Sequence, residues 1–345
     1  MIPIQNIYYM LSYAFQILNE QGYRNIATEQ FNNTGELIAA ILEKGIAIQL
    51  KRGLGKEYIL QTEALSSLRG KIDIAESIKT QSMLRKQLIC TYDEFSVNSI
   101  MNRIIKSTVE LLLRSNISKQ RKKNLRKLMV YFSEVDFIDL YTVNWNVQYN
   151  RNNQTYRMLI SICYLVVKGL LQTQSNGHTE LMDFLDEQRM CRLYEKFILE
   201  YYRKEFKNQF TANASQIPWQ LDNEENSMLP VMQSDIMLQS GEKVLIIDAK
   251  YYEHSTQVQF DKHTLHSGNL YQIFTYVKNK EYELREKDHT VSGMLLYAKT
   301  DEETYPNNVY QMNGNQITVR TLDLNLPFDE IAGQLNTIAK THFDL

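Results

Sequence analysis

The stretch LPVMQSDIMLQSGEKVLIIDAKYY, residues 229–252, decides the fold of the second half of the chain. Two apolar runs flank Ser240-Gly241, and this pattern predicts a β-hairpin. With an even-numbered loop centred on this pair, Asp235 faces Ile246 across the hairpin. The sequence therefore predicts two antiparallel strands joined by a tight turn, with an acidic residue near the outer end of the first strand.

Two carboxylates and a lysine fall on one face of this hairpin. Because side chains alternate along a strand, Asp248 and Lys250 share a face, and Asp235 lies diagonally from Asp248 at roughly 7 Å between backbones. Burying such charges costs several kcal/mol unless they are paired or bind a metal ion. Paired carboxylates suit Mg²⁺, and a lysine can stabilise charge on a phosphate, so one hypothesis is metal-assisted phosphodiester hydrolysis. The alternative is a surface hairpin in which Asp248 and Lys250 form an ordinary ion pair.

Two predicted helices flank the hairpin and carry further polar candidates. In CRLYEKFILEYYRKEF, Glu195 lies beside an apolar stripe, where it either closes a metal shell or is simply solvated. In NLYQIFTY, Gln272 and Tyr276 are four residues apart on one helical face. This pair either holds the lysine or a phosphate, or is a buried aromatic residue beside an amide.

The remaining pattern predicts two domains. The first half combines helices at 6–18, 35–44, 96–114 and 156–171 with short strands between 46 and 78, and the polar segment 172–180 is the best linker. Strands and helices alternate beyond this linker. We therefore expect an α+β domain over 1–180 and an α/β domain with a mixed central sheet over 181–345.

One segment of the first half is strongly basic. RSNISKQRKKNLRKL, from Arg114 to Leu128, has a local charge of +7 and contains no acid. A solvated helix face explains this run, and so does contact with a phosphate backbone or an acidic partner.

Composition narrows the function classes. The 345 residues are 43% hydrophobic with a net charge of −2, which excludes a disordered chain and a protein that coats nucleic acid by bulk charge. Three scattered cysteines argue against a disulfide framework or a zinc site. The chain has no leader pattern, no apolar run of about 18 residues and no GxxxxGK[ST] loop. We expect a cytoplasmic protein without membrane contact that does not itself bind GTP.

The order of the acid, Asp-x-Lys and Gln-x-x-x-Tyr motifs resembles the RecB-type branch of the PD-(D/E)xK nuclease superfamily, although Ser234 replaces the usual proline. Over nearly its full length the chain also resembles the McrC family, nuclease subunits of modification-dependent McrBC restriction systems. The segments that carry this resemblance are IPIQNIYYMLSYAF, NRIIKSTVELLL, YEKF, VLIIDAKYY and NLYQ.

The resemblance implies a Mg²⁺-dependent nuclease with a PD-(D/E)xK domain. Asp235, Asp248 and Glu195 would bind the metal, Lys250 would be catalytic, Gln272 would be accessory, and Tyr276 would bind substrate. The substrate would be double-stranded DNA that carries modified cytosine.

The resemblance also implies a partner, a McrB-type hexameric AAA+ GTPase that binds the GTP. The first half of the chain would dock into its central pore and stimulate GTP hydrolysis. Candidate contacts to this partner or to DNA are Arg69, Lys71, Arg121, Lys122 and Lys123. Two alternatives stay open: a stand-alone repair or recombination nuclease, and an AAA+ regulator without catalysis.

Overall fold

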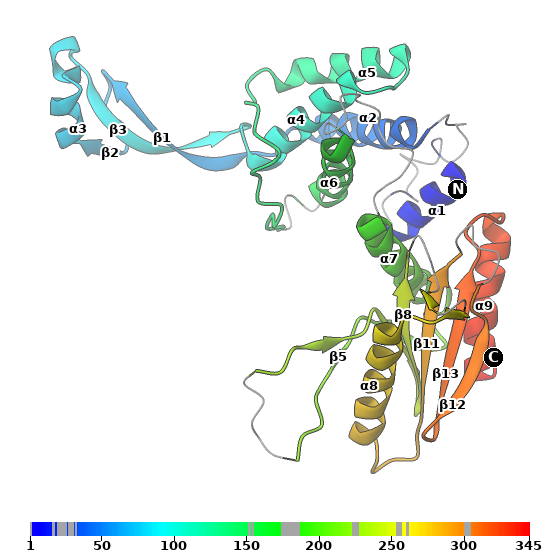
Figure 1. The fold of residues 1–345 in the computed structure, drawn as a ribbon. Coiled ribbons are helices and arrows are strands. Elements are labelled where there is room, and N and C mark those ends of the chain that lie inside the picture. The colour runs from blue at the N-terminus through cyan, green and yellow to red at the C-terminus, as the bar shows by residue number, and fades with distance from the viewer. Residues whose placement is uncertain are drawn as a thin grey trace. The chain divides into compact units, whose positions relative to one another are not determined.

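The computed structural model describes residues 2–15, 18, 26, 31, 33–150, 153, 155–173, 187–222, 228–252, 257–259, 262–299 and 305–345 (Figure 1). The chain divides into two compact units, one formed by Met1–Ala27 with Leu185–Leu345 and the other by Thr28–Phe184. No helix in these described ranges is long and apolar enough to cross a membrane. The predicted linker lies outside the described residues except for its first two, which end a helix.

The first helix of the chain belongs to the C-terminal unit, unlike the predicted division at residue 180. In α1 (Ile4–Ala14), Tyr9 stacks on Phe328 with ring centroids 4.4 Å apart. Asn6 Nδ2 donates a hydrogen bond to the backbone carbonyl of Leu324 at 2.8 Å. The apolar face of α1 therefore packs against the end of the chain, over a sequence separation that no local pattern reveals.

A six-stranded mixed sheet forms the centre of the C-terminal unit, in the order β12-β13-β11-β8-β7-β4. Strands β8, β11 and β13 are parallel, and the other pairs are antiparallel. This confirms the predicted mixed sheet. The strands are β4 (Thr211–Asn213), β7 (Ile236–Ser240), β8 (Lys243–Lys250), β11 (Thr290–Ala298), β12 (Asn308–Met312) and β13 (Asn315–Leu322). Two short ribbons accompany them: β5 (Gln216–Ile217) with β6 (Met232–Gln233), and β9 (Gln257–Gln259) with β10 (Lys262–Thr264).

The predicted hairpin exists, but its register was wrong by two residues. Ser240 pairs with Lys243, so the turn is Gly241-Glu242 and not Ser240-Gly241. Gly241 has a φ of +58°, the conformation that glycine favours at the first central position of a two-residue hairpin. The ladder begins at the pair Ile236–Ile247, and extending its register by one residue places Asp235 opposite Asp248 instead of Ile246. A shift of two preserves which side chains share a face.

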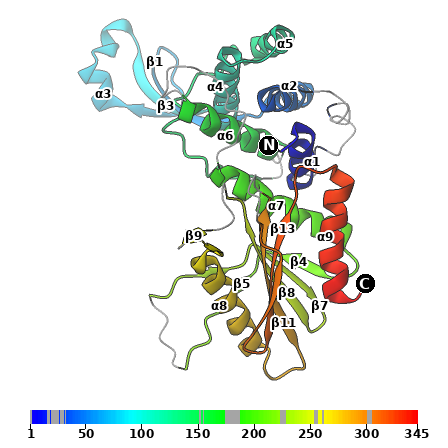
Figure 2. The ribbon, with the colours of Figure 1, turned by 45° about the vertical axis from the view of Figure 1, so that its right-hand side comes forward.

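Helices cover the sheet on both sides (Figure 2). The side chains of Ile246 and Leu295 pack with Ile273 and Val277 of α8 (Ser267–Glu283) in one buried cluster. The other helices of the unit are α7 (Glu187–Glu205) and α9 (Phe328–Phe343), and α8 and α9 lie on opposite sides of the strands in Figure 2. Helices α7 and α9 are joined by a hydrogen bond from the Tyr202 hydroxyl to the Leu335 carbonyl, 3.0 Å long.

The other unit combines helices with a three-stranded antiparallel sheet in the order β1-β3-β2. Its elements are α2 (Thr34–Arg52), β1 (Glu57–Leu65), β2 (Lys71–Asp73), α3 (Ile74–Lys79), η3 (Ser82–Arg85), β3 (Leu88–Ser96), α4 (Ile100–Arg114), α5 (Lys119–Met129), η4 (Val130–Phe132) and α6 (Tyr156–Thr173).

The sequence misassigned parts of this unit. Residues 47–52 alternate in polarity like a strand but continue α2. The helix ends at Arg52, and Gly53 caps it with a φ of +88°. Strand β3 was not predicted, because its stability comes from nine residue pairs with the distant β1. Helix α4 begins after Ser99 and not after the predicted Ser96. The Ser99 hydroxyl accepts a hydrogen bond from the backbone N–H of Asn102.

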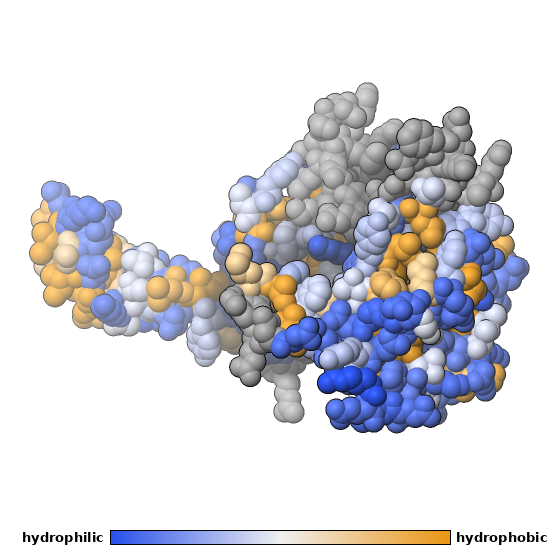
Figure 3. Space-filling model, turned by 60° about the horizontal axis from the view of Figure 1, so that its bottom comes forward, coloured by the Kyte–Doolittle hydropathy of each residue, from blue (hydrophilic) through white to orange (hydrophobic). Residues whose placement is uncertain are grey.

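Residues 57–96, which we call the arm, extend away from the helices of their unit (Figure 1). Strands β1 and β3 pair over nine residues each, and β2, α3 and η3 lie at the far end. Orange, apolar side chains gather at this end in Figure 3. The exposed apolar residues there are Leu68, Ile74, Ile78, Met83 and Leu84.

Candidate active site

The candidate site lies at the end of β8, where Asp248 and Lys250 share one face of the strand. Asp248 is only 1% exposed, since β8 lies between β7 and β11 in the interior of the sheet. Lys250 Nζ lies 2.9 Å from both carboxylate oxygens of Asp248. The alternative of an exposed surface hairpin with an ordinary ion pair is therefore wrong, because this pair is buried.

Burial controls the ionisation of this pair. Desolvation raises the pKa of the Asp248 carboxyl, Lys250 opposes that rise, and the charge of Asp235 adds to it. For Lys250, burial favours the neutral amine, but the attraction of Asp248 is stronger and raises the pKa of the ammonium group. Lys250 is therefore held protonated. Because Asp248 is buried, its carboxylate is stable in the ionised form only with a positive charge beside it.

Asp235 reaches the same place from the neighbouring strand. It stands directly before β7, and its Oδ2 accepts a hydrogen bond from the backbone N–H of Ala249 at 2.9 Å. The preceding Ser234 is fixed through its backbone N–H, which donates to the carbonyl of Ser215 at 3.0 Å. Asp235 and Asp248 thus lie on adjacent strands with their carboxyl groups interacting, as the strand periodicity predicted.

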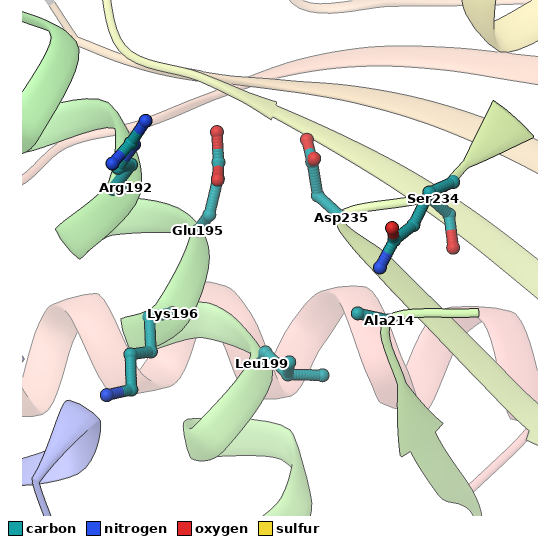
Figure 4. Close-up of a pocket in the computed structure, with 8 residues that line it drawn as sticks. Arg192, Glu195, Lys196, Leu199, Ala214, Ser234 and Asp235 are labelled. Atoms are coloured by element: carbon teal, nitrogen blue, oxygen red, sulfur yellow. The ribbon is translucent and has the colours of Figure 1, made fainter. Parts of the chain in front are cut away.

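Glu195 projects from α7, and its carboxyl group points to the same side as that of Asp235 (Figure 4). Burial raises the pKa of the Glu195 carboxyl, and the charge of Asp235 raises it further. Cys191 Sγ donates a hydrogen bond to Glu195 Oε1 at 3.1 Å, and burial raises the pKa of this thiol to about 12. The sequence reasoning missed Cys191 as a neighbour of the site, although its spacing of four residues from Glu195 places both on one helical face.

A pocket of about 380 Å³ opens beside the carboxylates of Glu195 and Asp235. Four of its residues come from α7 and four from the strand side; they are Arg192, Glu195, Lys196, Leu199, Ala214, Gln233, Ser234 and Asp235 (Figure 4). The pocket therefore brings carboxylates and cations to one opening on the surface of the unit. Arg192 was not singled out from the sequence.

Gln272 and Tyr276 lie on the α8 side of the same strand. Lys250 Nζ lies 3.5 Å from Gln272 Oε1, and Gln272 Nε2 donates to the Tyr276 hydroxyl at 3.0 Å. Tyr276 is 8% exposed and belongs to the apolar cluster beneath α8. This position lets Tyr276 orient the amide of Gln272, and a direct role in substrate binding stays a prediction.

A divalent metal fits two of the predicted acids. Asp248 Oδ2 is buried and has Lys250 Nζ at 2.9 Å as an ion-pair partner, but it makes no hydrogen bond of good geometry. Mg²⁺ needs only one or two protein carboxylates, because water and substrate oxygens complete its shell. Within the described ranges, no group of three or more His, Cys, Asp or Glu side chains is arranged to hold a metal. Asp235 and Asp248 would be enough protein ligands for such an ion, and metal binding by these two residues and by Glu195 stays a prediction.

The predicted contact residues of the first half lie at two places in their unit. Arg69 stacks over the Tyr92 ring at 4.1 Å, and Lys71 is exposed on β2 of the arm. On α5, Arg121 forms an ion pair with Glu43 at 2.9 Å, which ties α5 to α2. Arg121 therefore has a structural role. Lys122 is half-buried and Lys123 exposed on the same helix.

The fold and the site together define a mixed α/β protein with an Asp-x-Lys site on a central strand and a second carboxylate beside it. The chain belongs to the family described as McrBC 5-methylcytosine restriction system component, which it matches over residues 5–298. It is 30% identical over 329 residues to the type IV methyl-directed restriction enzyme EcoKMcrBC of Escherichia coli (strain K12), covering 94% of this chain and 93% of that protein.

A solved structure shares the fold. It is a half-complex from a tetradecameric assembly of Thermococcus gammatolerans McrB AAA+ hexamers with bound McrC. The match has a TM-score of 0.51 and 18% identity, and it covers 97% of this chain and 76% of that one. This chain is therefore a McrC homologue.

Proposed function

We propose that the chain is the endonuclease subunit of a restriction complex and hydrolyses phosphodiester bonds of double-stranded DNA with Mg²⁺. The observation that carries this proposal is the buried Asp248 carboxylate, which lies next to Asp235 and Lys250 at the end of a central strand. A charge set this costly to bury is expected where chemistry requires it. Membership of the McrBC family supports the reaction class.

Each residue has a distinct task in this proposal. Asp235 and Asp248 would hold the metal, which when bound makes a coordinated water more acidic and neutralises phosphate charge. Lys250 is protonated and would place its Nζ against a phosphate oxygen, where it stabilises the negative charge that develops. Gln272 limits the directions in which the lysine can point, because its amide is held by Tyr276. The proposed assignment to the PD-(D/E)xK superfamily rests on the order of these residues along the chain: Asp235, then Asp248 and Lys250, then Gln272 and Tyr276.

We infer that the chain works with an AAA+ GTPase in the cytoplasm. The McrC of Thermococcus gammatolerans is bound to McrB AAA+ hexamers, and the sequence of this chain contains no GxxxxGK[ST] phosphate-binding loop. The arm, with apolar side chains exposed at its far end, is the part of residues 28–184 best suited to enter a central pore. The family description supports DNA with modified cytosine as the substrate.

The test uses the complete complex with GTP, Mg²⁺ and a plasmid that contains methylated cytosine. We expect Asp248→Asn to abolish cleavage, because it removes a charged oxygen from the metal site. Stimulation of GTP hydrolysis should stay at the wild-type level, since the substitution lies outside the proposed docking surface.

Asp288→Asn is the matched control, because Asp288 is an exposed aspartate of the same unit. This variant should cut like the wild type. Cleavage by Asp248→Asn at the wild-type rate would contradict the nuclease assignment, and cleavage by the chain without GTPase or GTP would favour a stand-alone nuclease.

A further inference from the structure

The pocket beside the carboxylates has one wall on a single face of α7. Arg192, Glu195, Lys196 and Leu199 follow the spacing of three, four and seven residues that brings side chains to one side of a helix. The site described above uses only Glu195 from this wall. The two cations therefore need an explanation of their own.

The cations differ in their surroundings. Lys196 Nζ lies 4.0 Å above the ring of Phe15, and in Figure 4 its side chain points away from the carboxylates. Arg192 is exposed, and no hydrogen bond or close ion pair joins it to a described residue, although its charge lowers the pKa of the Glu195 carboxyl. Its side chain lies on the same side of the pocket as Glu195 and Asp235 in Figure 4.

Arg192 thus acts on Glu195 through its charge, but within the described part of the chain no direct contact holds its guanidinium group in place. By comparison, Arg203 of the same helix donates to the carbonyl of Ala212 at 2.9 Å and pairs with Glu200 at 2.7 Å. An arginine whose role is to neutralise Glu195 or Asp235 would be expected to form such direct contacts with their carboxylates. Arg192 lines the pocket and is exposed, so its guanidinium group is accessible to a ligand there.

The chemistry of the pocket favours an anion that presents several oxygens. The planar guanidinium group matches the oxygens of a phosphate and can bind two of them at once. A polyanion that approaches Asp235 and Glu195 is repelled, and a cation in the same opening offsets that repulsion. The volume of about 380 Å³ is within the range of ligand pockets and leaves room for a phosphate with its sugar.

The geometry points to a second phosphate subsite, in which Arg192 binds a backbone phosphate adjacent to the one that is cleaved. This inference rests on the proposed nuclease function and names a substrate contact that the Asp-x-Lys site does not contain. The contact reads no base sequence, because phosphate contacts only set the position and register of a duplex. Lys196 flanks this subsite and Ser234 closes its far wall.

The first measurement is DNA binding by the full chain. A fluorescent 30-base-pair duplex is titrated at several KCl concentrations with the Asp248→Asn chain, which does not cut, and with the same chain carrying Arg192→Ala or Arg192→Lys. We expect Arg192→Ala to weaken binding roughly tenfold, as for loss of a charge-assisted hydrogen bond. The slope of log affinity against log salt should decrease in size by about 0.9, the effect of one phosphate contact. Arg192→Lys should recover part of both.

Arg285→Ala is the matched control. Arg285 is an exposed arginine of the same unit and follows the C-terminal end of α8, remote from Gln272. It should bind like the parent chain. Equal affinity and equal salt slope for Arg192→Ala and its parent would overturn the subsite, and so would a parent chain that does not bind the duplex.

The second measurement separates phosphate binding from an electrostatic effect on Glu195. In the complex with its GTPase, Arg192→Ala should need more DNA for half-maximal cleavage but keep the wild-type pH profile. An altered pH profile with unchanged DNA affinity would overturn the subsite and make Arg192 a positioning residue for Glu195. A wild-type complex that leaves DNA intact would overturn the proposed function, whereas equal cutting by wild type and Arg192→Ala would overturn this inference alone.

Discussion

At the scale of single residues, the site is a balance between burial and charge. Asp248 is buried in the sheet and tolerates ionisation because Lys250 lies 2.9 Å away. Removing one member of a buried pair leaves an uncompensated charge, which costs far more than the pair contributes in net stability. The lysine therefore stabilises the folded chain as well as serving the proposed reaction.

Replacing Lys250 should expose this dependence. We expect Lys250→Met to lower the free energy of unfolding by about 3 kcal/mol at pH 8. Burial raises the pKa of Asp248. A carboxyl group with a raised folded-state pKa contributes stability that is present below its unfolded pKa and is lost as the pH rises through the folded value. The deficit should therefore be smaller at pH 5.5 than at pH 8.

Urea unfolding of wild type and variant at both pH values measures this deficit. Lys287→Met, at an exposed lysine of the same unit, should show no deficit at either pH. A deficit for Lys250→Met that stays constant with pH would mean that the lost stability comes from packing and not from the charge of Asp248.

Part of this site could be predicted from the sequence. The strand period of two placed Asp235, Asp248 and Lys250 together, and it did so even though the turn was misplaced, because the error was an even number of residues. Cys191 and Arg192 could not be found in the same way. Cys191 lies near the site, and Arg192 lines the pocket, because of the way α7 packs against the sheet. The sequence pattern of α7 does not specify this packing.

At the scale of elements, the distance between α8 and the sheet is set by Gly293 in β11. A Cβ atom there would lie 2.9 Å from side-chain atoms of Ile273, Val277 and Ile317. Helix α8 carries Gln272, so its close approach also determines how near the amide comes to Lys250. Packing and site geometry thus depend on the same glycine.

Gly293→Ala should lower the free energy of unfolding by about 1–3 kcal/mol, because the core must move to admit the methyl group. Gly333→Ala is the matched substitution, in the exposed face of α9 with no atom within 4 Å of the added carbon. It should raise stability by about 0.5–1 kcal/mol, since alanine favours a helix interior. Thermal unfolding of both variants measures the two effects, and an unaffected Gly293→Ala would mean that α8 is not packed against β11 this closely.

Elements were predicted best where a local pattern determines them. The long amphipathic helices and the existence of the β7–β8 hairpin follow from sequence periodicity and turn chemistry. Local patterns did not predict strand β3 or the C-terminal end of α2. Pairing with the distant β1 determines the conformation of β3, and the surrounding helices determine that of α2.

At the scale of the molecule, the arm is the part with least support from the rest of its unit. Leu84 is 81% exposed and Ile78 is 63% exposed, so these side chains gain little stability within the chain. Large exposed apolar groups that cluster in this way mark an interaction surface. We propose that they contact the AAA+ partner.

Leu84→Asp should therefore weaken association with the GTPase roughly tenfold or more, the loss of one buried leucine side chain. Its stimulation of GTP hydrolysis should fall in parallel, while the thermal midpoint of the isolated chain stays unchanged. Val309→Asp, at an exposed apolar side chain of the other unit, is the control and should associate normally. Normal association of Leu84→Asp would exclude the end of the arm from the contact.

The membership of α1 in the C-terminal unit also has a consequence for synthesis. Asn6 donates its hydrogen bond to a carbonyl 318 positions further along the chain. At a translation rate of about 5–20 residues per second, Leu324 is synthesised roughly 16–60 s after Asn6. Helix α1 cannot pack against its partner segment before then. A truncated product would therefore have an incomplete core in its C-terminal unit. Under the proposed nuclease function, such a product would not cut the cell's own chromosome.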